Sequence, residues 1–344
     1  MLKANRYRSL GYTSFFDEDS GFFARLPDEG KPEPFWSPHG PELMDISITN
    51  WCDMGCAFCY KSSTRRGSHM SISDYKSVID QAAKMGTFQV ALGGGNPNQH
   101  PDFIEILEYT RSKGIVPNYT TNGRGLTQEI LQVTKSNCGA VAVSAYEPFD
   151  EAADAIQLLT ASGIKTNVHF ILDAFSIDTA IEWLKEPPAF LEPVNALIFL
   201  NYKPSGRKVF EERMLRNSAR LDEFFSLATA PTARQKVGFD ACCVSGLFAR
   251  TDANNALVDA CDAGRFSLYV SEDMRVYPCS FQAALADGDL LDEATSLHDI
   301  WMNSDNVRSF RSYFASDRCG GCSHRANCMN GCPIFDDLVV CGNR

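Results

Sequence analysis

The sequence predicts an α/β fold, a partial (β/α)6 TIM-like barrel that is followed by a cysteine-rich C-terminal domain. Short apolar strands alternate with amphipathic helices, and helix–glycine–strand junctions recur at Gly86, Gly114, Gly139 and Gly163. Repeats of this length, with near-continuous apolar strands, are typical of a parallel sheet covered by helices. Cysteines gather directly after the first barrel strand and again in the C-terminal third. The expected domains are an N-terminal hairpin and lead-in over residues 1–43, the barrel over 44–235 and the C-terminal domain over 236–344.

The composition is that of a globular protein with an acidic surface. A chain of 344 residues, 44% of them hydrophobic, can hold one barrel and a small module. The net charge of −11 argues against nucleic-acid or anionic-membrane partners. Neither a signal peptide nor a long apolar run is present, so we expect a cytoplasmic protein. In a reducing compartment the 13 cysteines are expected to be metal ligands rather than disulfides.

The N-terminal residues 1–43 are rich in aromatic side chains. Tyr12–Phe16 and Phe22–Leu26 flank a polar turn, which predicts two short strands of a hairpin, and Lys31–Pro41 is an extended lead-in. The hairpin either caps the base of the barrel or offers an edge to which a peptide partner adds a strand.

The barrel elements follow from local periodicity and capping residues. Met44–Thr49 is a strand, and Ser71 begins a helix that Gly86 ends. The next helix begins at His100-Pro101-Asp102, with proline in its first turn. The remaining strands are expected at Phe88–Leu92, Ile115–Thr120, Val141–Ser144, Ile164–Leu172 and Asn195–Tyr202.

Three cysteines, Cys52, Cys56 and Cys59, stand within eight residues directly after the first barrel strand. Barrels of this kind place their chemistry at the C-terminal ends of the strands. Closely spaced thiolates can hold one iron–sulfur cluster from a single loop, and three ligands leave one iron open. Zinc is a poor alternative because no histidine stands at ligand spacing. Three unrelated buried thiols are the remaining alternative.

With Phe58 directly before the last cysteine, this triplet resembles the signature of the radical S-adenosylmethionine (SAM) enzymes. The resemblance implies that the open iron binds the amino and carboxylate groups of SAM. One-electron cleavage of SAM then gives a deoxyadenosyl radical that abstracts a hydrogen atom from the substrate. Such chemistry belongs to the cofactor, and the protein supplies binding, orientation and exclusion of water.

Loops after the later strands resemble the SAM-binding loops of this family. Gly93-Gly94-Gly95-Asn96-Pro97 is similar to its Gly-Gly-Glu-Pro motif, with a neutral Asn96 in place of Glu. His169 on the fifth strand is either a core residue or a ligand contact, and Arg207 either meets a carboxylate or is solvated. The resemblance implies cofactor binding by Phe58, Gly93, Gly94, Gly95, Asn96, Pro97, Thr121, Asn122, Ser144, His169 and Arg207.

The C-terminal cysteines follow a second pattern. A hairpin is expected over Phe266–Cys279 and a helix over Ser296–Ala315. Seven thiols with one histidine among them exceed a single zinc site. Their spacing resembles the SPASM extension of radical SAM enzymes, which carries two auxiliary iron–sulfur clusters, although Met274 replaces the usual turn glycine.

The SPASM resemblance assigns the thiols to two groups. Cys261, Cys279 and Cys332 would hold the first auxiliary cluster, with Cys242 preferred over Cys243 or an open site as its fourth ligand. Cys138 is expected to be a buried apolar side chain. The second cluster would take Cys319, Cys322, Cys328 and Cys341, so that the protein binds three [4Fe-4S] clusters in total.

The resemblance implies an oxidoreductase that modifies a peptide or small protein, with a crosslink in a ribosomally made peptide (RiPP) expected first. Sulfatase-type formylglycine maturation is second, because that branch places an Asp base where this chain has Ser280. A small-molecule radical SAM dehydrogenase and a non-catalytic electron-transfer protein are further alternatives.

A flavodoxin or ferredoxin is the expected electron donor. The first 43 residues are too few for a leader-binding domain, which leaves either a separate leader-binding protein or a small substrate. Substrate identity, the bond formed and the oligomeric state are not encoded in these patterns.

Overall fold

The computed structural model describes residues 1–216, 218–230, 236–254, 257–338 and 340–341. Its centre is a curved sheet in which six consecutive parallel strands lie side by side in chain order. These are β4 (Leu43–Thr49), β5 (Gln89–Gly94), β6 (Val116–Thr121), β7 (Val141–Ala145), β8 (Thr166–Leu172) and β9 (Ala196–Asn201).

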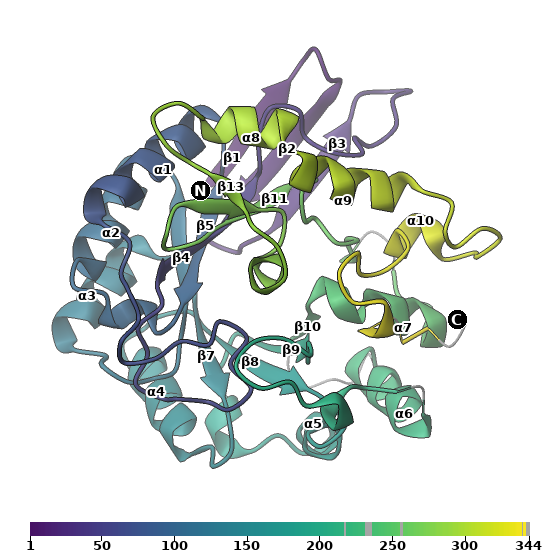
Figure 1. Cartoon of the computed structure of the whole chain (residues 1–344). Helices are drawn as coiled ribbons and strands as arrows, with labels where there is room; N and C mark the ends of the chain where they lie inside the picture. The colour runs from purple at the N-terminus through teal and green to yellow at the C-terminus, as the bar shows by residue number, and fades with distance from the viewer. Residues whose placement is uncertain (217, 231–235, 255–256, 339, 342–344) are drawn as a thin grey trace.

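Helices surround the outside of this sheet (Figure 1). They are α1 (Ile72–Lys84), α2 (Phe103–Ser112), α3 (Gln128–Asn137), α4 (Asp150–Ala161), α5 (Ile177–Lys185) and α6 (Ala219–Ala228). The predicted partial (β/α)6 barrel is confirmed.

Strands from the C-terminal part of the chain extend the barrel sheet at both edges. β10 (Val237–Phe239) pairs in parallel with β9, and β11 (Ser267–Val270) pairs in parallel with β4. From there β12 (Arg275–Tyr277) and β13 (Asp289–Leu290) continue the sheet in antiparallel pairing. The sheet therefore crosses the expected domain boundary at 235/236, which stays a prediction.

Alternation along β4 decides which side chains face the barrel interior. Met44, Ile46 and Ile48 are fully buried in the core that packs against the helices. Because successive side chains of a strand point to opposite faces, Asp45 and Ser47 face the interior instead. Burying each of the three apolar side chains stabilises the fold by roughly 1.5–3 kcal/mol.

The helix α1 shows how the sequence sets an element's ends. Ser71 is the N-cap, and its hydroxyl accepts a hydrogen bond from the Asp74 amide at 3.1 Å. Gly86, with φ +77°, follows the last turn in the left-handed conformation that glycine adopts without steric cost. Tyr75 and Val78 are fully buried against the sheet.

The N-terminal residues form three strands rather than the expected two: β1 (Leu2–Tyr7), β2 (Tyr12–Asp17) and β3 (Phe23–Pro27). This small sheet packs at the N-terminal ends of the barrel strands. The rings of Phe16 and Phe88 lie 5.8 Å apart, and Asn5 donates a hydrogen bond to the Gly86 carbonyl at 2.8 Å. The arrangement matches the capping interpretation of this segment.

The C-terminal helices are α7 (Val244–Arg250), α8 (Leu297–Asn303), α9 (Asp305–Ala315) and α10 (Arg325–Cys328). The single helix expected over Ser296–Ala315 is broken at Ser304, whose hydroxyl caps α9 by accepting from the Val307 amide. In the β11–β12 turn, Met274 has φ +62°, which explains why glycine is usual there. Single 3-10 turns lie at Pro97–Gln99, Ala189–Leu191, Glu211–Arg213, Ala241–Cys243, Ser280–Ala284 and Asp336–Leu338. No helix within the described residues has the length and apolar character needed to cross a bilayer.

Candidate functional site

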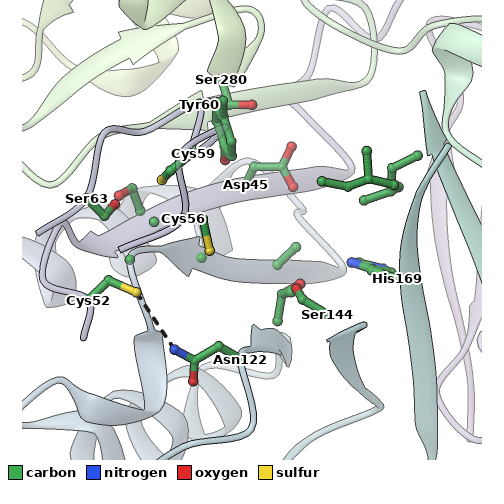
Figure 2. A pocket seen from close by; sticks show the side chains of 18 of the residues that line it. Asp45, Cys52, Cys56, Cys59, Tyr60, Ser63, Asn122, Ser144, His169 and Ser280 are labelled. Atoms are coloured by element: carbon green, nitrogen blue, oxygen red, sulfur yellow. Dashed lines mark hydrogen bonds between the residues drawn. The ribbon is translucent and has the colours of Figure 1, made fainter. Parts of the chain in front are cut away.

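A cavity of about 430 Å³ lies inside the barrel at the C-terminal ends of its strands. Figure 2 shows side chains converging on it from the cysteine loop, from the barrel strands and from the segment after β12. The predicted residues that line it are Cys52, Cys56, Phe58, Cys59, Gly93, Gly94, Gly95, Thr121, Asn122, Ser144 and His169.

The cysteine loop is held in shape by hydrogen bonds to its backbone. The Cys52 amide donates to the Thr64 carbonyl at 3.0 Å. The Arg207 guanidinium donates to the carbonyls of Cys56, at 3.0 Å, and of Ser63, while the Arg207 amide donates to the Cys59 carbonyl at 3.0 Å. Arg207 does not line the cavity. Arg207 therefore fastens the cysteine loop, and the expected contact between its guanidinium and SAM stays a prediction.

Two glycines allow the β5 loop to pass close beneath the cysteine loop. A Cβ on Gly95 would lie 2.0 Å from the Trp51 carbonyl oxygen, one residue before Cys52. Gly94 has φ +108°, and a Cβ there would lie 2.1 Å from the Thr49 carbonyl oxygen. Only glycine fits at such separations, so this motif fixes the backbone path under the three thiols.

Asn96 has a different role from the one expected. Its carbonyl oxygen accepts from the Asn122 amide at 3.1 Å and from the Thr121 hydroxyl at 3.2 Å, while its amide donates to Gln99 at 2.8 Å. A glutamate carboxylate at this position has no N–H group and could not donate the hydrogen bond to Gln99. Neither Asn96 nor Pro97 lines the cavity. Asn96 joins the β5 and β6 loops, and direct cofactor contact from these two residues is not supported.

Asn122 and His169 face the cavity from different strands. The Asn122 side-chain amide donates to Asp53 at 3.2 Å and lies 3.7 Å from the Cys52 sulfur. Burial lowers the pKa of His169 to about 4, so its imidazole is neutral at physiological pH. His169 therefore offers a neutral donor or acceptor, and it cannot supply a positive charge to a carboxylate.

The sequence interpretation missed two carboxylates on the cavity wall, those of Asp45 and Asp240. Asp45 faces the cavity from β4, and burial raises its pKa to about 6. Lys203 forms an ion pair with Asp240, and both residues line the cavity. The one sequence signal for Asp45 is the polar alternation Asp45, Ser47, Thr49 within an otherwise apolar strand.

Asp45→Asn is expected to raise the free energy of unfolding at neutral pH by about 3 kcal/mol, since one pKa unit corresponds to about 1.4 kcal/mol. The pKa is higher in the folded protein than in the unfolded chain. The contribution of the protonated form is therefore complete below the unfolded pKa and is lost as the pH rises through about 6. Neutral Asn removes the cost of the buried carboxylate. Anaerobic thermal denaturation of both proteins tests this, and a less stable Asn variant would contradict it.

The C-terminal thiols gather in two places. Cys242, Cys261, Cys279 and Cys332 line a second cavity of about 30 Å³, together with Cys328, whereas Cys243 does not. The pKa of Cys332 is lowered to about 7, chiefly by a hydrogen bond from Cys242. The amides at residues 334 and 335 also donate to the Cys332 sulfur, each at 3.4 Å. Such donors favour a thiolate, the form that ligates iron.

The second C-terminal group surrounds Cys328. Burial raises the pKa of Cys328, and Cys319, Cys322 and Cys341 add to this shift electrostatically, which places the four thiols near one another. Within the described residues, no three His, Cys, Asp or Glu side chains converge tightly enough to hold a single metal ion. Thiolates that ligate different irons of one cluster need not meet at one point. Cys138 packs at the edge of the barrel core, away from both groups.

Comparison with known proteins places these features in known families. Residues 46–157 match the Radical SAM superfamily, and residues 261–328 match SPASM, an iron–sulfur cluster-binding domain. Mycofactocin maturase MftC of Mycobacterium tuberculosis is 25% identical over 330 residues, covering 85% of this chain and 78% of that protein. PqqA peptide cyclase of Gluconobacter oxydans is 21% identical, covering 89% of each.

Among solved structures, Streptococcus suis SuiB bound to its precursor peptide SuiA superposes with a TM-score of 0.70 at 17% identity. The superposition covers 86% of this chain and 72% of SuiB, and at this identity it shows a shared fold. The motifs, the barrel and the family matches agree. The chain carries a radical SAM domain followed by a C-terminal SPASM iron–sulfur cluster-binding domain.

Proposed function

We propose that this protein is a radical SAM enzyme that modifies a peptide, most simply by forming a crosslink in a ribosomally made precursor. The observation that carries the proposal is one cavity that reaches from Cys52, Cys56 and Cys59 to Ser280 and Phe281, directly after the SPASM hairpin. A substrate in it would lie between the SAM-binding loop and the C-terminal thiols. Among the relatives, a mycofactocin maturase and a PqqA peptide cyclase support a peptide substrate.

The donor sets fit iron–sulfur clusters. Cys52, Cys56 and Cys59 would hold the SAM-binding cluster in the large cavity. When bound, the cluster and SAM supply a one-electron cleavage that generates a deoxyadenosyl radical. Cys242, Cys261, Cys279 and Cys332 would ligate the first auxiliary cluster, and Cys319, Cys322, Cys328 and Cys341 the second.

The chain's own residues would bind SAM and keep water from it. Gly93, where a Cβ would meet no atom within 4 Å, leaves space for a ligand beside the cysteine loop. Asn122 and Ser144 offer hydrogen bonds to its polar groups. The rings of Phe58 and Tyr146, 5.2 Å apart, close one side of the cavity with apolar surface. Excluding water protects a radical from side reactions.

A flavodoxin or ferredoxin is the proposed electron donor, and a separate leader-binding protein is proposed for substrate delivery. Sulfatase-type maturation is the weaker candidate, because Ser280 follows Cys279 where a carboxylate would be expected. Small-molecule dehydrogenation is also weaker, given the peptide-modifying relatives.

The proposed function is tested with reconstituted protein, dithionite and SAM. Formation of 5′-deoxyadenosine is expected, and its absence would favour a non-catalytic electron-transfer protein. Coexpression with short open reading frames that neighbour the gene, followed by mass spectrometry of their peptides, then identifies the substrate. If SAM is cleaved but no peptide is changed, the assignment to peptides is wrong.

Three [4Fe-4S] clusters predict about 12 iron and about 12 sulfide ions per chain. Cys242→Ala should lower cluster stability at the first auxiliary site, whereas Cys243→Ala, the adjacent thiol outside that cavity, should leave the iron content unchanged. Anaerobic iron and sulfide analysis of the three proteins measures both effects. Iron near four per chain in the parent protein would contradict the two auxiliary clusters.

A further inference from the structure

The carboxylate of Asp45 occupies an unusual place in the large cavity. It projects from β4 into the space that Tyr60, Ser280 and His169 also border (Figure 2). No hydrogen bond or ion pair links it to any other described residue. The other carboxylate on the cavity wall, that of Asp240, is paired with Lys203.

An unpaired carboxylate in such a cavity does not stabilise the fold. Removing a charge from water without a compensating partner costs free energy, so the barrel would be more stable with an amide or an apolar side chain there. The carboxylate of Glu272 shows how such a group is usually stabilised. It accepts a hydrogen bond at 2.7 Å from the hydroxyl of Ser47, two residues further along β4 than Asp45. The position of Asp45 is better explained by a ligand that occupies the cavity.

Asp45 also lies beside the SPASM hairpin, because β11 pairs in parallel with β4 and sets Tyr269 opposite Asp45. The ring of Tyr60, from the cysteine loop, lies 4.5 Å from the ring of Phe281, which follows Ser280, and all of these residues line the same cavity. Asp45 therefore lies between the SAM-binding loop and the SPASM hairpin, on the side of the cavity where Ser280 stands.

We propose that Asp45 is the catalytic base of the modification step, supplied by the first barrel strand instead of by the residue after Cys279. This rests on the proposed function. The substrate loses a hydrogen atom from a C–H bond to the deoxyadenosyl radical. An S–H, O–H or N–H group of the substrate then gives its proton to the Asp45 carboxylate, which becomes a carboxylic acid, while its lone pair forms a bond to the carbon radical. The surplus electron would be accepted by an oxidised iron–sulfur cluster, which Cys242, Cys261, Cys279 and Cys332 would hold.

The other polar groups in the cavity are poorer bases. The Ser280 hydroxyl is not ionised at neutral pH, and the Lys203 ammonium is protonated beside Asp240. His169, with its pKa near 4, holds a proton weakly. A pKa of about 6 leaves Asp45 mostly ionised at neutral pH and still able to hold a proton, which suits general-base catalysis.

The test compares Asp45→Asn and Asp45→Glu with the parent holoenzyme, using the peptide found by coexpression, and measures 5′-deoxyadenosine and modified peptide in the same reaction. For Asp45→Asn, SAM cleavage should continue while modified peptide falls by about 100-fold or more, the usual contribution of a general base. Asp45→Glu should restore part of the yield of modified peptide. Asp154→Asn, the same substitution at an exposed carboxylate of α4 outside both cavities, should retain both products.

Modified peptide from Asp45→Asn within about threefold of the parent would overturn the proposal, since a general base contributes far more. Parallel loss of deoxyadenosine and modified peptide would also overturn it, because Asp45 would then support SAM binding or folding. No recovery in Asp45→Glu would count against a proton-transfer role.

A second measurement needs no peptide and so separates this proposal from the proposed function. Diisopropylcarbodiimide reacts with protonated carboxyl groups in apolar surroundings. Labelling of Asp45 in the parent holoenzyme, mapped by mass spectrometry, should increase as the pH falls from mildly alkaline to mildly acidic. If exposed carboxyl groups are labelled and Asp45 is not, the carboxylate is not available in the cavity and the proposal fails.

Discussion

Replacing Cys56 with alanine is expected to reduce SAM cleavage to background while the barrel stays folded. Cys56 lies in a loop, and its side chain lines the large cavity. The apolar core is formed by strands and helices elsewhere. A cluster held by three thiolates has no spare ligand, so the loss of one leaves it without a stable site. Production of 5′-deoxyadenosine and the iron content, expected to fall by about four per chain, measure the effect.

The matched control for this change is Cys138→Ala. Cys138 is packed against the barrel core and lies outside both cavities, so its removal should leave iron content and SAM cleavage unchanged. Circular dichroism of the Cys56→Ala protein should match that of the parent. Deoxyadenosine at parental levels from Cys56→Ala would refute the assignment of the cysteine loop.

Lys203→Met is expected to lower the free energy of unfolding by about 3–5 kcal/mol, the usual cost of leaving a buried charge unpaired. Burial acts against the charge of Lys203, but Asp240 outweighs it and the pKa of Lys203 is raised. Without Lys203, Asp240 keeps only polar partners, among them the Asn201 amide at 3.3 Å. Anaerobic denaturation of the variant and the parent measures the loss.

The double variant Lys203→Met with Asp240→Asn separates the ion pair from packing. A neutral amide can keep the contact with the Asn201 backbone and leaves no charge unpaired, so more than half of the lost stability should return. If the double variant is as unstable as Lys203→Met, the loss arises from packing of the Lys203 side chain, whose ammonium lies 5.0 Å from the centre of the Phe281 ring.

Most barrel elements could be predicted because each is specified by nearby residues. A helix such as α1 has its N-cap, its apolar spacing and its terminating glycine within sixteen residues, Ser71 to Gly86. The cysteine loop could be predicted for the same reason, since its three thiols are close in sequence. The first strand, β1, could not, because its exposed and half-exposed residues follow no clear apolar alternation.

The contacts that Asn96 and Arg207 make could not be predicted, because a motif gives a position without its hydrogen-bonding partners. Each lies in the predicted loop, but Asn96 bonds to residues of the β6 loop and Arg207 to carbonyls about 150 residues earlier. A side chain whose hydrogen-bonding capacity is used by the protein is no longer available to a ligand. Only the folded chain shows which donors are used.

The sequence by itself determined the barrel, the cysteine loop and the family, because periodicity, caps and closely spaced thiols are local properties. Only the tertiary structure decided that Cys242 lines a cavity with Cys261, Cys279 and Cys332, and that Cys243 does not. It also placed Asp45 between the cysteine loop and the SPASM hairpin, because β11 pairs with β4 across more than two hundred residues of chain. Burial and charge pairing depend on such distant contacts, and no local pattern encodes them.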